Sequence, residues 1–394
     1  MKLLLLLCLM DCFLAIGQAS SGTFNVLNYG ATADGIGDDS KAFMAAWKAA
    51  CSFTGGVKLL IPKGTYLVGP VKFDGPCRNV SSITVSMEGY LKASTNLSKY
   101  VSGDDWIQFG WVHHLTLTGG GTFDGQGAVS WPFNECSKRE KCKVLPSSIK
   151  FVYTEHTVVK SIKSLNSKFF HIVLLGCKNF WGSNIVAQAP SDSPNTDGFH
   201  IERSSGVSIY SSVIATGDDC ISIGQTNERV VISGITCGPG HGISVGSLGR
   251  YENEGDVKGL LIKDCTLSGT TNGLRIKTWQ NSPGKSSVSN LTFQNIILKS
   301  VANPIIIDQA YCPYADCSSK VPSWVSIRDI IFSDIRGTST TPVAVTLKCS
   351  SGVPCENVNL HNVDLRYVGG SPTIAECLNV KATYSGTQLP LPCN

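Results

Sequence analysis

The chain has 394 residues, of which 16% are charged, and its formal net charge is +4. This mild excess comes without a run of basic residues, so it argues against a nucleic-acid partner and suits an acidic one. Glycine is abundant, with 40 residues, and β-branched residues with Asn and Ser dominate the C-terminal two thirds. That composition favours many short strands and turns.

The first 19 residues form a segment of their own. Met1-Lys2 precedes two apolar stretches, 3–10 and 12–16, and small residues stand three and one positions before the bond after Ala19. This pattern predicts a secretory signal peptide; the alternative, an N-terminal core helix, is less favoured. No later segment is long and apolar enough to cross a bilayer. We therefore expect residues 20–394 to form one secreted domain without a membrane partner.

One amphipathic helix is expected near the start of that domain. Asp38-Asp39-Ser40 offers an N-cap, and the following residues place Phe43, Trp47 and Ala50 on one stripe. Helical periodicity largely disappears after this point.

Fourteen cysteines follow the signal segment, and an even number in a secreted chain predicts disulfides. Three close pairs suggest clips on loops: Cys136 with Cys142, Cys312 with Cys317, and Cys349 with Cys355. None has the CxxC spacing of a zinc site, so a metal cluster is not expected. Sequons at Asn79, Asn96 and Asn290 are candidate glycosylation sites and agree with secretion.

A loose strand motif recurs from residue 180 onward. It occurs at 180–186, 208–214, 230–236, 260–266, 291–297, 330–336 and 358–364. Its anchor residues are Ile185, Val213, Ile235, Cys265, Ile296, Ile335 and Val363, at spacings of 28, 22, 30, 31, 39 and 28. Such a strand-rich repeat predicts an all-β parallel β-helix, rather than a propeller or a sandwich. Less regular coils are expected at 85–93 and 115–125, and the amphipathic helix would cover the open end of the spiral.

Polar side chains return at the period of one coil. Asp197, Asp219 and His241 are separated by 22 residues each. If one coil takes 22 residues, these side chains stack on one face at steps of about 4.8 Å. In a later coil, Arg275 and Lys277 are two residues apart and share one strand face, while Ile276 points into the core.

The stretch TGDDCISIG, 216–224, places two aspartates where a strand would bend outward, with Ile221 and Ile223 returning to the core. Glycosidic cleavage needs one protonated and one ionised carboxyl, and crowded carboxylates create that division. Arg275 and Lys277 could bind a sugar carboxylate. The residues thus favour a glycosidase for an acidic sugar, although a surface turn or a calcium site remains an alternative for the aspartates.

Four motifs in this order carry a resemblance: NTDG at 195–198, GDD at 217–219, GHG at 240–242 and RIK at 275–277. With 24–43 and 61–73, they make the chain similar to plant polygalacturonases, the pectin-hydrolysing glycoside hydrolases with a right-handed parallel β-helix. The N-terminal segments look closest to the pollen-type exopolygalacturonase branch. The likeness covers nearly the whole mature chain.

The resemblance implies hydrolysis of α-1,4 links between galacturonic acids, with inversion and without a metal or other cofactor. The implied catalytic residues are Asp218 as general acid, Asp197 and Asp219 to activate water, and His241 to support protonation of the acid. The implied substrate-binding residues are Asn195, Arg275, Lys277 and Tyr311. Simple stacking gives carboxylates near 5 Å, whereas inversion favours about 6.5–9.5 Å, so we expect the Asp218 carboxyl to point away from the other two.

The resemblance also implies four disulfides: Cys51–Cys77, Cys220–Cys237, Cys349–Cys355 and Cys377–Cys393. The segment 131–148 could close one end of the cleft, as exo action requires, or be a surface loop. Endo action, a calcium-dependent pectate lyase and a non-catalytic pectin-binding wall protein are the alternatives. A monomer in the extracellular cell wall is expected, because a solenoid needs no partner to bury its core.

Overall fold

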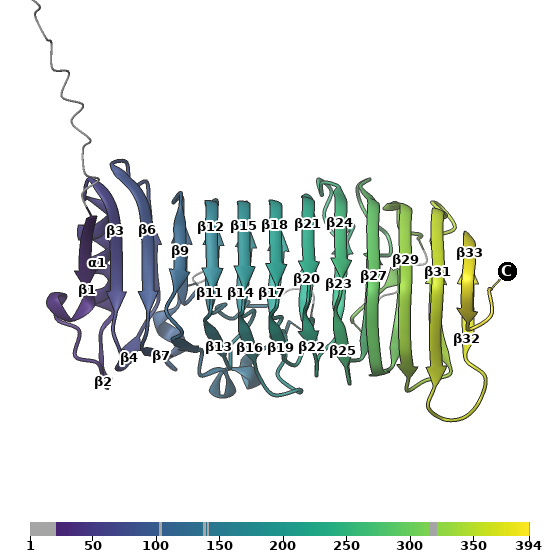
Figure 1. Cartoon of the computed structure of the whole chain (residues 1–394), viewed down its shortest axis with the longest axis horizontal. Coiled ribbons are helices and arrows are strands. Elements are labelled where there is room, and N and C mark those ends of the chain that lie inside the picture. The colour runs from purple at the N-terminus through teal and green to yellow at the C-terminus, as the bar shows by residue number, and fades with distance from the viewer. Residues whose placement is uncertain (1–20, 102–104, 137–138, 140–141, 315–320, 394) are drawn as a thin grey trace, which may run out of the picture.

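The computed structural model of this chain describes residues 21–101, 105–136, 139, 142–314 and 321–393. The expected signal peptide therefore lies outside the described residues. The described chain winds into a right-handed parallel β-helix, with strands of successive coils stacked side by side along the long axis (Figure 1). The fold class predicted from the sequence is confirmed.

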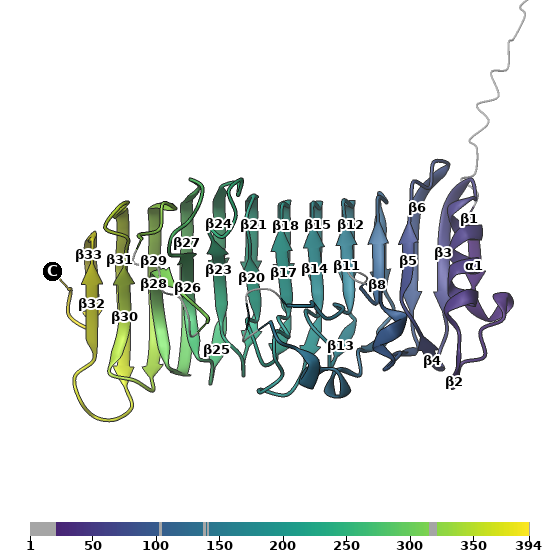
Figure 2. The ribbon, with the colours of Figure 1, turned by 180° about the vertical axis from the view of Figure 1, so that it is seen from behind.

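The described strands form two parallel sheets. The smaller contains β5 (Val71–Asp74), β8 (Ile107–Gly110), β11 (Ile149–Val152), β14 (Ile172–Leu175), β17 (Phe199–Glu202), β20 (Ile221–Ile223), β23 (Ile243–Leu248), β26 (Asn272–Trp279), β28 (Asn303–Tyr311), β30 (Val343–Lys348) and β32 (Ile374–Leu378). Figure 2 shows these strands following one another along the spiral.

The larger sheet begins as two columns of short strands. Its members are β1 (Ser21–Asn25), β2 (Asp34–Asp38), β3 (Gly55–Ile61), β4 (Thr65–Val68), β6 (Val80–Met87), β7 (Tyr90–Ala93), β9 (Leu115–Thr118), β10 (Thr122–Asp124), β12 (Glu155–Lys160), β13 (Lys163–Leu165), β15 (Lys178–Ser183), β16 (Val186–Gln188), β18 (Ser205–Tyr210), β19 (Val213–Ala215), β21 (Asn227–Ser233), β22 (Thr236–Cys237), β24 (Val257–Lys263), β25 (Thr266–Ser268), β27 (Ser287–Val301), β29 (Ser326–Ser339), β31 (Cys355–Tyr367) and β33 (Val380–Leu389). The columns merge at β27, which pairs with both β24 and β25. Earlier coils therefore have three strands, and later coils have two longer faces.

The helix α1 (Ser40–Cys51) covers the N-terminal end of the spiral (Figure 2). Phe43, Trp47 and Ala50 are buried, as the sequence predicts, and the Trp47 ring lies 5.1 Å from that of Phe73. The expected cap differs in detail, because the Asp39 carboxylate accepts the backbone N–H of Thr32 and makes no capping bond. Short 3₁₀ turns complete the helical segments: η1 (Val26–Tyr29), η2 (Leu97–Lys99), η3 (Gly127–Val129) and η4 (Trp131–Phe133).

The repeat anchors form a buried ladder, with one correction. Six of the seven expected anchors are at most 1% exposed, but Val213 is 45% exposed. The strand register pairs Val186 with Val213, so Ser212 occupies the ladder position opposite Ile185. Its hydroxyl accepts the backbone N–H of Ile185 at 3.2 Å. The sequence pattern was misread by one residue because a serine replaces the aliphatic side chain in this coil.

Five disulfides join described cysteines. They are Cys51–Cys77, Cys136–Cys142, Cys220–Cys237, Cys349–Cys355 and Cys377–Cys393. These include the four pairs that the resemblance implies, and the clip at Cys136. Cys317 lies outside the described residues. Asn79, Asn96 and Asn290 are all exposed. Within the described ranges, no helix has the length and apolar character needed to cross a membrane.

Candidate active site

The polar residues spaced by 22 do stack on neighbouring coils. Asp197, Asp219 and His241 each stand two residues before a strand of the smaller sheet: β17, β20 and β23 respectively. The register places Phe199 beside Ile221 and Ile221 beside Ile243, which confirms the 22-residue coil. Ile221 and Ile223 are fully buried in the core, whereas Asp218 and Asp219, which precede β20, line a groove.

Glycines let His241 lie close to the aspartate pair. Gly242 has a φ of +86°, and a Cβ there would lie 2.1 Å from the carbonyl oxygen of Asn272. Gly240 has a φ of +147°, and its Cβ would lie 2.7 Å from the Asp218 carbonyl oxygen. That carbonyl accepts the backbone N–H of His241 at 2.8 Å. The GHG motif therefore permits the close approach of two turns.

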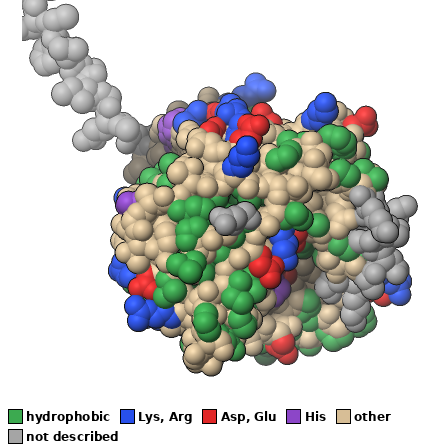
Figure 3. All heavy atoms as spheres, turned by 90° about the vertical axis from the view of Figure 1, so that its right-hand side faces the viewer, with side chains coloured by type: hydrophobic (Ala, Val, Ile, Leu, Met, Phe, Trp, Pro, Cys, Tyr) green, Lys and Arg blue, Asp and Glu red, His purple; other side chains and the backbone are tan. Residues whose placement is uncertain are grey.

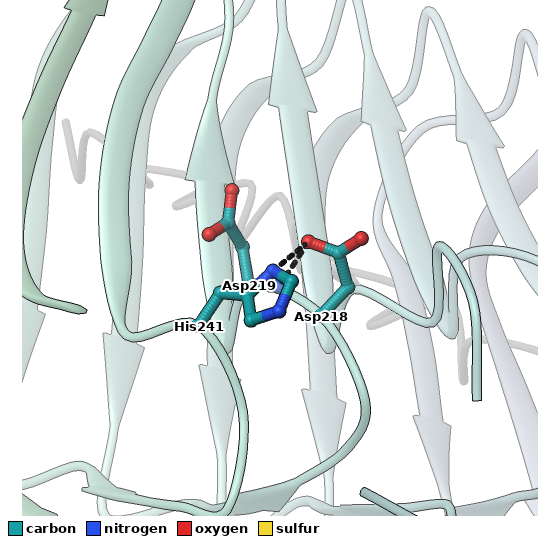
Figure 4. A group of neighbouring side chains, drawn as sticks. All are labelled: Asp218, Asp219 and His241. Carbon is teal, nitrogen blue, oxygen red and sulfur yellow. Dashed lines mark hydrogen bonds and ion pairs between the residues drawn. The ribbon is translucent and has the colours of Figure 1, made fainter. Parts of the chain in front are cut away.

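Asp218 and His241 form an ion pair at the surface of this group (Figure 4). The Asp218 Oδ1 atom lies 2.9 Å from His241 Nδ1, and Asn195 Nδ2 lies 3.4 Å from Asp218 Oδ2. The hydrogen bond to Asp218 raises the pKa of His241 above 6.5, although burial opposes this. The same hydrogen bond favours the protonated imidazole, which places a proton donor beside the Asp218 carboxyl.

Asp219 is buried beneath two cations. Its Oδ1 atom accepts a hydrogen bond from Arg275 Nη2 at 2.8 Å, and its Oδ2 atom accepts one from Lys277 Nζ at 2.9 Å. Ser244 Oγ also donates to Oδ1 at 2.9 Å. Burial alone would raise the pKa of Asp219, but Lys277 and Arg275 lower it to about 2. This carboxylate stays ionised.

Asp197 has its pKa shifted in the opposite direction. It is 5% exposed, and burial raises its pKa well above the ordinary value, assisted by the nearby charges of Asp218 and Asp219. Burial and neighbouring charges therefore separate the pKa values of two carboxyls, lowering that of Asp219 and raising that of Asp197. The sequence predicts such a division between crowded carboxyls, and the assignment of Asp218 as the general acid stays a prediction.

Asp218, Asp219 and His241 have ligand atoms within 4.8 Å of one another, as a metal site would. Yet Arg275 and Lys277 already neutralise Asp219, and a dication would have to lie beside both. The donor set therefore fits a cation poorly. One oxygen of Asp218 and one of Asp219 lie within 4.8 Å of each other, and the two carboxyl groups are turned in different directions (Figure 4).

These residues line a groove of about 660 Å³. In the view along the spiral, acidic, basic and His side chains meet around a hollow (Figure 3). Tyr311 also lines the groove, with Lys277 Nζ 5.3 Å from its ring centre. Asn195 lies at the same edge as Asp218. Every predicted catalytic and substrate-binding residue is thus brought to one groove, and Cys136 and Cys142 line it as well.

Sequence reasoning missed several residues in and beside the groove. His200, Ser222 and Ser244 stack in register on the outward face of β17, β20 and β23, and they repeat at the same 22-residue step as the acids. The His200 Nδ1 atom lies 2.8 Å from Ser222 Oγ. The coil period could have found them. Arg250 lines the groove from the corner after β23, where the period gives no signal, and Trp279 lines it from the end of β26.

A parallel β-helix whose groove holds three carboxyl groups, one kept ionised by two cations and one paired with an imidazole, has the arrangement of a glycoside hydrolase. Residues 51–386 match glycosyl hydrolases family 28, and the chain belongs to this family.

Its relatives carry more specific names. An exopolygalacturonase of Platanus acerifolia is 48% identical over 95% of this chain and 98% of its own length. One of Zea mays is 43% identical over 96% of this chain and 92% of its own. The crystal structure of an exopolygalacturonase from Thermotoga maritima superposes with a TM-score of 0.74, covering 92% of this chain and 91% of that one, at 17% identity, which supports the fold.

Proposed function

We propose that this protein hydrolyses the α-1,4 bonds of polygalacturonate from the non-reducing end, as a galacturan 1,4-α-galacturonidase. The observation that carries the proposal is the Asp219 carboxylate, held ionised by Arg275 and Lys277 beside the Asp218–His241 pair. The exopolygalacturonase names of relatives that align along almost their whole length support the substrate and the exo mode.

The charge states favour distinct roles for the three aspartates. Asp218 faces the groove and is paired with His241, so it is the proposed acid that protonates the leaving oxygen. Asp219 stays ionised and is the proposed acceptor of the proton from water. The pKa of Asp197 is raised by burial, so we propose that it helps to hold this water rather than deprotonating it alone.

The substrate carboxylate has two cations within the groove. Arg275 and Lys277 each use one hydrogen bond on Asp219, and both carry further N–H groups that can donate to a sugar carboxylate. Tyr311 and Asn195 are the proposed contacts to the sugar itself. No metal or cofactor has a role in this proposal.

Products released over time test the proposal. With trigalacturonate and polygalacturonate, the exo mode predicts monogalacturonate from the first minutes, and solution viscosity that stays high while reducing ends appear. A fast fall in viscosity with few new ends would mean endo action.

Stereochemistry is a separate test. We expect the β-anomer to appear first in proton NMR spectra, because the water attacks the face opposite the leaving group. Early α-anomer would show retention, which the close Asp218 and Asp219 oxygens would then explain.

Chelation separates hydrolysis from the alternatives. We expect full activity in EDTA and no new ultraviolet absorbance, because the donor set beside Arg275 and Lys277 disfavours a dication. Loss of activity in EDTA with unsaturated products would instead indicate a calcium-dependent lyase. Binding of polygalacturonate without any products would indicate a non-catalytic wall protein.

We further propose that residues 1–19 are removed on secretion and that residues 20–394 act as a monomeric extracellular domain in the cell wall. Asn79, Asn96 and Asn290 are exposed and are the proposed glycan acceptors. Mass spectrometry of the secreted protein would show the new N-terminus and the occupied sequons, and light scattering would give its mass in solution.

A further inference from the structure

Arg250 lies in an aromatic wall of the groove that the proposed reaction does not yet use. The wall consists of Arg250, Tyr251, Trp279 and Tyr314, all of which line the groove. The Arg250 guanidinium lies 5.2 Å from the Trp279 ring centre and 5.5 Å from that of Tyr251. The Trp279 ring in turn contacts Tyr314, with centroids 5.8 Å apart.

The turn that carries this arginine is held by a buried carboxylate. Glu254 is 9% exposed, and its two oxygens accept the backbone N–H groups of Gly249, Arg250 and Tyr251 at 2.6–2.9 Å. These bonds fix the backbone at the start of the wall. The backbone position of Arg250 is thus set by the fold before any ligand binds.

Stacking leaves the guanidinium able to recognise an anion. Aromatic rings contact the flat face of the group, whereas its N–H bonds point outward in the plane of the guanidinium. An in-plane carboxylate can therefore accept two hydrogen bonds while the stack is kept. An aromatic ring that packs against the sugar would complete such a site. Tyr314 and Trp279 supply two aromatic rings there.

The charges along the groove call for such a cation. Arg275 and Lys277 share the charge of Asp219, so this set keeps a single net positive charge for substrate. A polygalacturonate segment across the cleaved bond brings two carboxylates. Among the described lining residues, Arg250 is the remaining Lys or Arg.

We propose that Arg250, stacked on Trp279 and Tyr251, binds the carboxylate of the galacturonate next to the unit held by Arg275 and Lys277. The enzyme then selects a free carboxylate over a methyl ester at that unit. This inference rests on the proposed function, because it concerns the substrate of the same groove.

Substitution of Arg250→Gln tests the selection. For unesterified oligogalacturonate we expect kcat/KM to fall about ten- to a hundredfold, as for loss of a charged hydrogen bond. For the same oligomer with methyl esters we expect little change, so the preference for the free acid shrinks. Arg250→Lys should retain part of the preference, because it keeps the charge but not the planar contact.

Arg328→Gln is the matched control, since Arg328 is an exposed arginine on β29 of the other sheet, paired with Asp329. It should leave kcat/KM unchanged for both substrates.

Equal losses of kcat/KM on the two substrates in Arg250→Gln, or no loss on either, would overturn the proposal. Affinities for the acid and the ester, measured by calorimetry in an Asp218→Asn background, give the same comparison without turnover. If the parent enzyme releases no galacturonate, the proposed function fails, while these affinities still decide the role of Arg250.

Discussion

Asp218 is the side chain on which the proposed chemistry turns. Asp218→Asn keeps the shape but cannot deliver a proton, so we expect kcat on polygalacturonate to fall about 10²–10⁴-fold. Affinity for trigalacturonate, measured by calorimetry, should be nearly unchanged. Asp192→Asn is the control, because Asp192 is an exposed carboxylate in the loop that precedes Asp197. Unaltered turnover in Asp218→Asn would show that another group is the acid.

The cations above Asp219 should set the acidic limit of activity. Asp219 has its pKa lowered from 3.8 to about 2, so its ionised form contributes stability above pH 3.8 that is lost as pH falls toward 2. Lys277→Met leaves the burial and removes a cation, so the pKa of Asp219 rises. We expect the acidic limb of the kcat/KM profile to move to higher pH, and the free energy of unfolding at pH 5 to fall by about 3 kcal/mol.

Lys348→Met controls for a general loss of charge. Lys348 lies on the same outward face, exposed, and pairs with Glu376 at 2.8 Å. We expect Lys348→Met to lower the free energy of unfolding by less than about 1 kcal/mol. It should leave the acidic limb of the kcat/KM profile in place. A limb that moves equally in both variants would argue against a local effect on Asp219.

At the scale of single residues, the sequence predicted which residues belong to the site better than it predicted their charge states. Residue spacing predicts that Asp197, Asp219 and His241 meet, because parallel strands hold a fixed register. It does not predict which carboxyl keeps the proton, since that depends on burial and on side-chain contacts such as Lys277 to Asp219. Arg250 escaped prediction because corners vary in length.

Among the elements, the disulfide Cys220–Cys237 joins the residue after the aspartate pair to strand β22. Replacing both cysteines with alanine should lower the free energy of unfolding by about 3 kcal/mol, as for a loop of this length. We also expect kcat to fall, because Asp218 and Asp219 would be held less firmly in position. Denaturant titration and steady-state kinetics measure the two effects.

Cys377–Cys393 provides the matched comparison, with a sequence separation of 16 against 17 and a place at the far C-terminal end. Its double alanine variant should lose similar stability while kcat is unchanged. The same fall of kcat in both variants would mean that stability, and not the placement of the aspartates, limits activity.

Strand prediction succeeded where side chains alternate clearly and failed by one residue at β19. The repeat pattern took Val213 as the inward residue, but Val213 is exposed and Ile214 is buried. Because Ser212 occupies a core position, the alternation of apolar and polar residues does not show whether Val213 or Ile214 points inward. The hydrogen bond from Ile185 to Ser212 explains why a polar side chain is tolerated there.

In the whole molecule, each coil contacts mainly its neighbours, so damage at one end should stay near that end. Trp47 is 3% exposed, so Trp47→Ala leaves a cavity in the core. We expect this substitution to lower the free energy of unfolding by about 3–5 kcal/mol. Hydrogen exchange should speed up most in β3 to β8 and little in β20 to β26.

Trp181→Ala is the control for this substitution, because Trp181 is 40% exposed on the larger sheet. Trp181→Ala should lower the free energy of unfolding by less than about 1 kcal/mol, and hydrogen exchange should not change in any one region. Uniform acceleration along the whole chain in Trp47→Ala would show that the spiral unfolds as a single cooperative unit.

The coils around the aspartates also restrict how the gene can change in length. From Phe199 through Ile221 to Ile243 the path repeats without a spare residue, and one codon gained or lost within a strand would exchange its inner and outer faces. Beyond Ile243 the corners carry longer excursions, such as the one that bears Arg250. Relatives of this enzyme should therefore differ in loop size at those corners, where new substrate preferences can arise, while the stretch from 197 to 243 keeps a constant length.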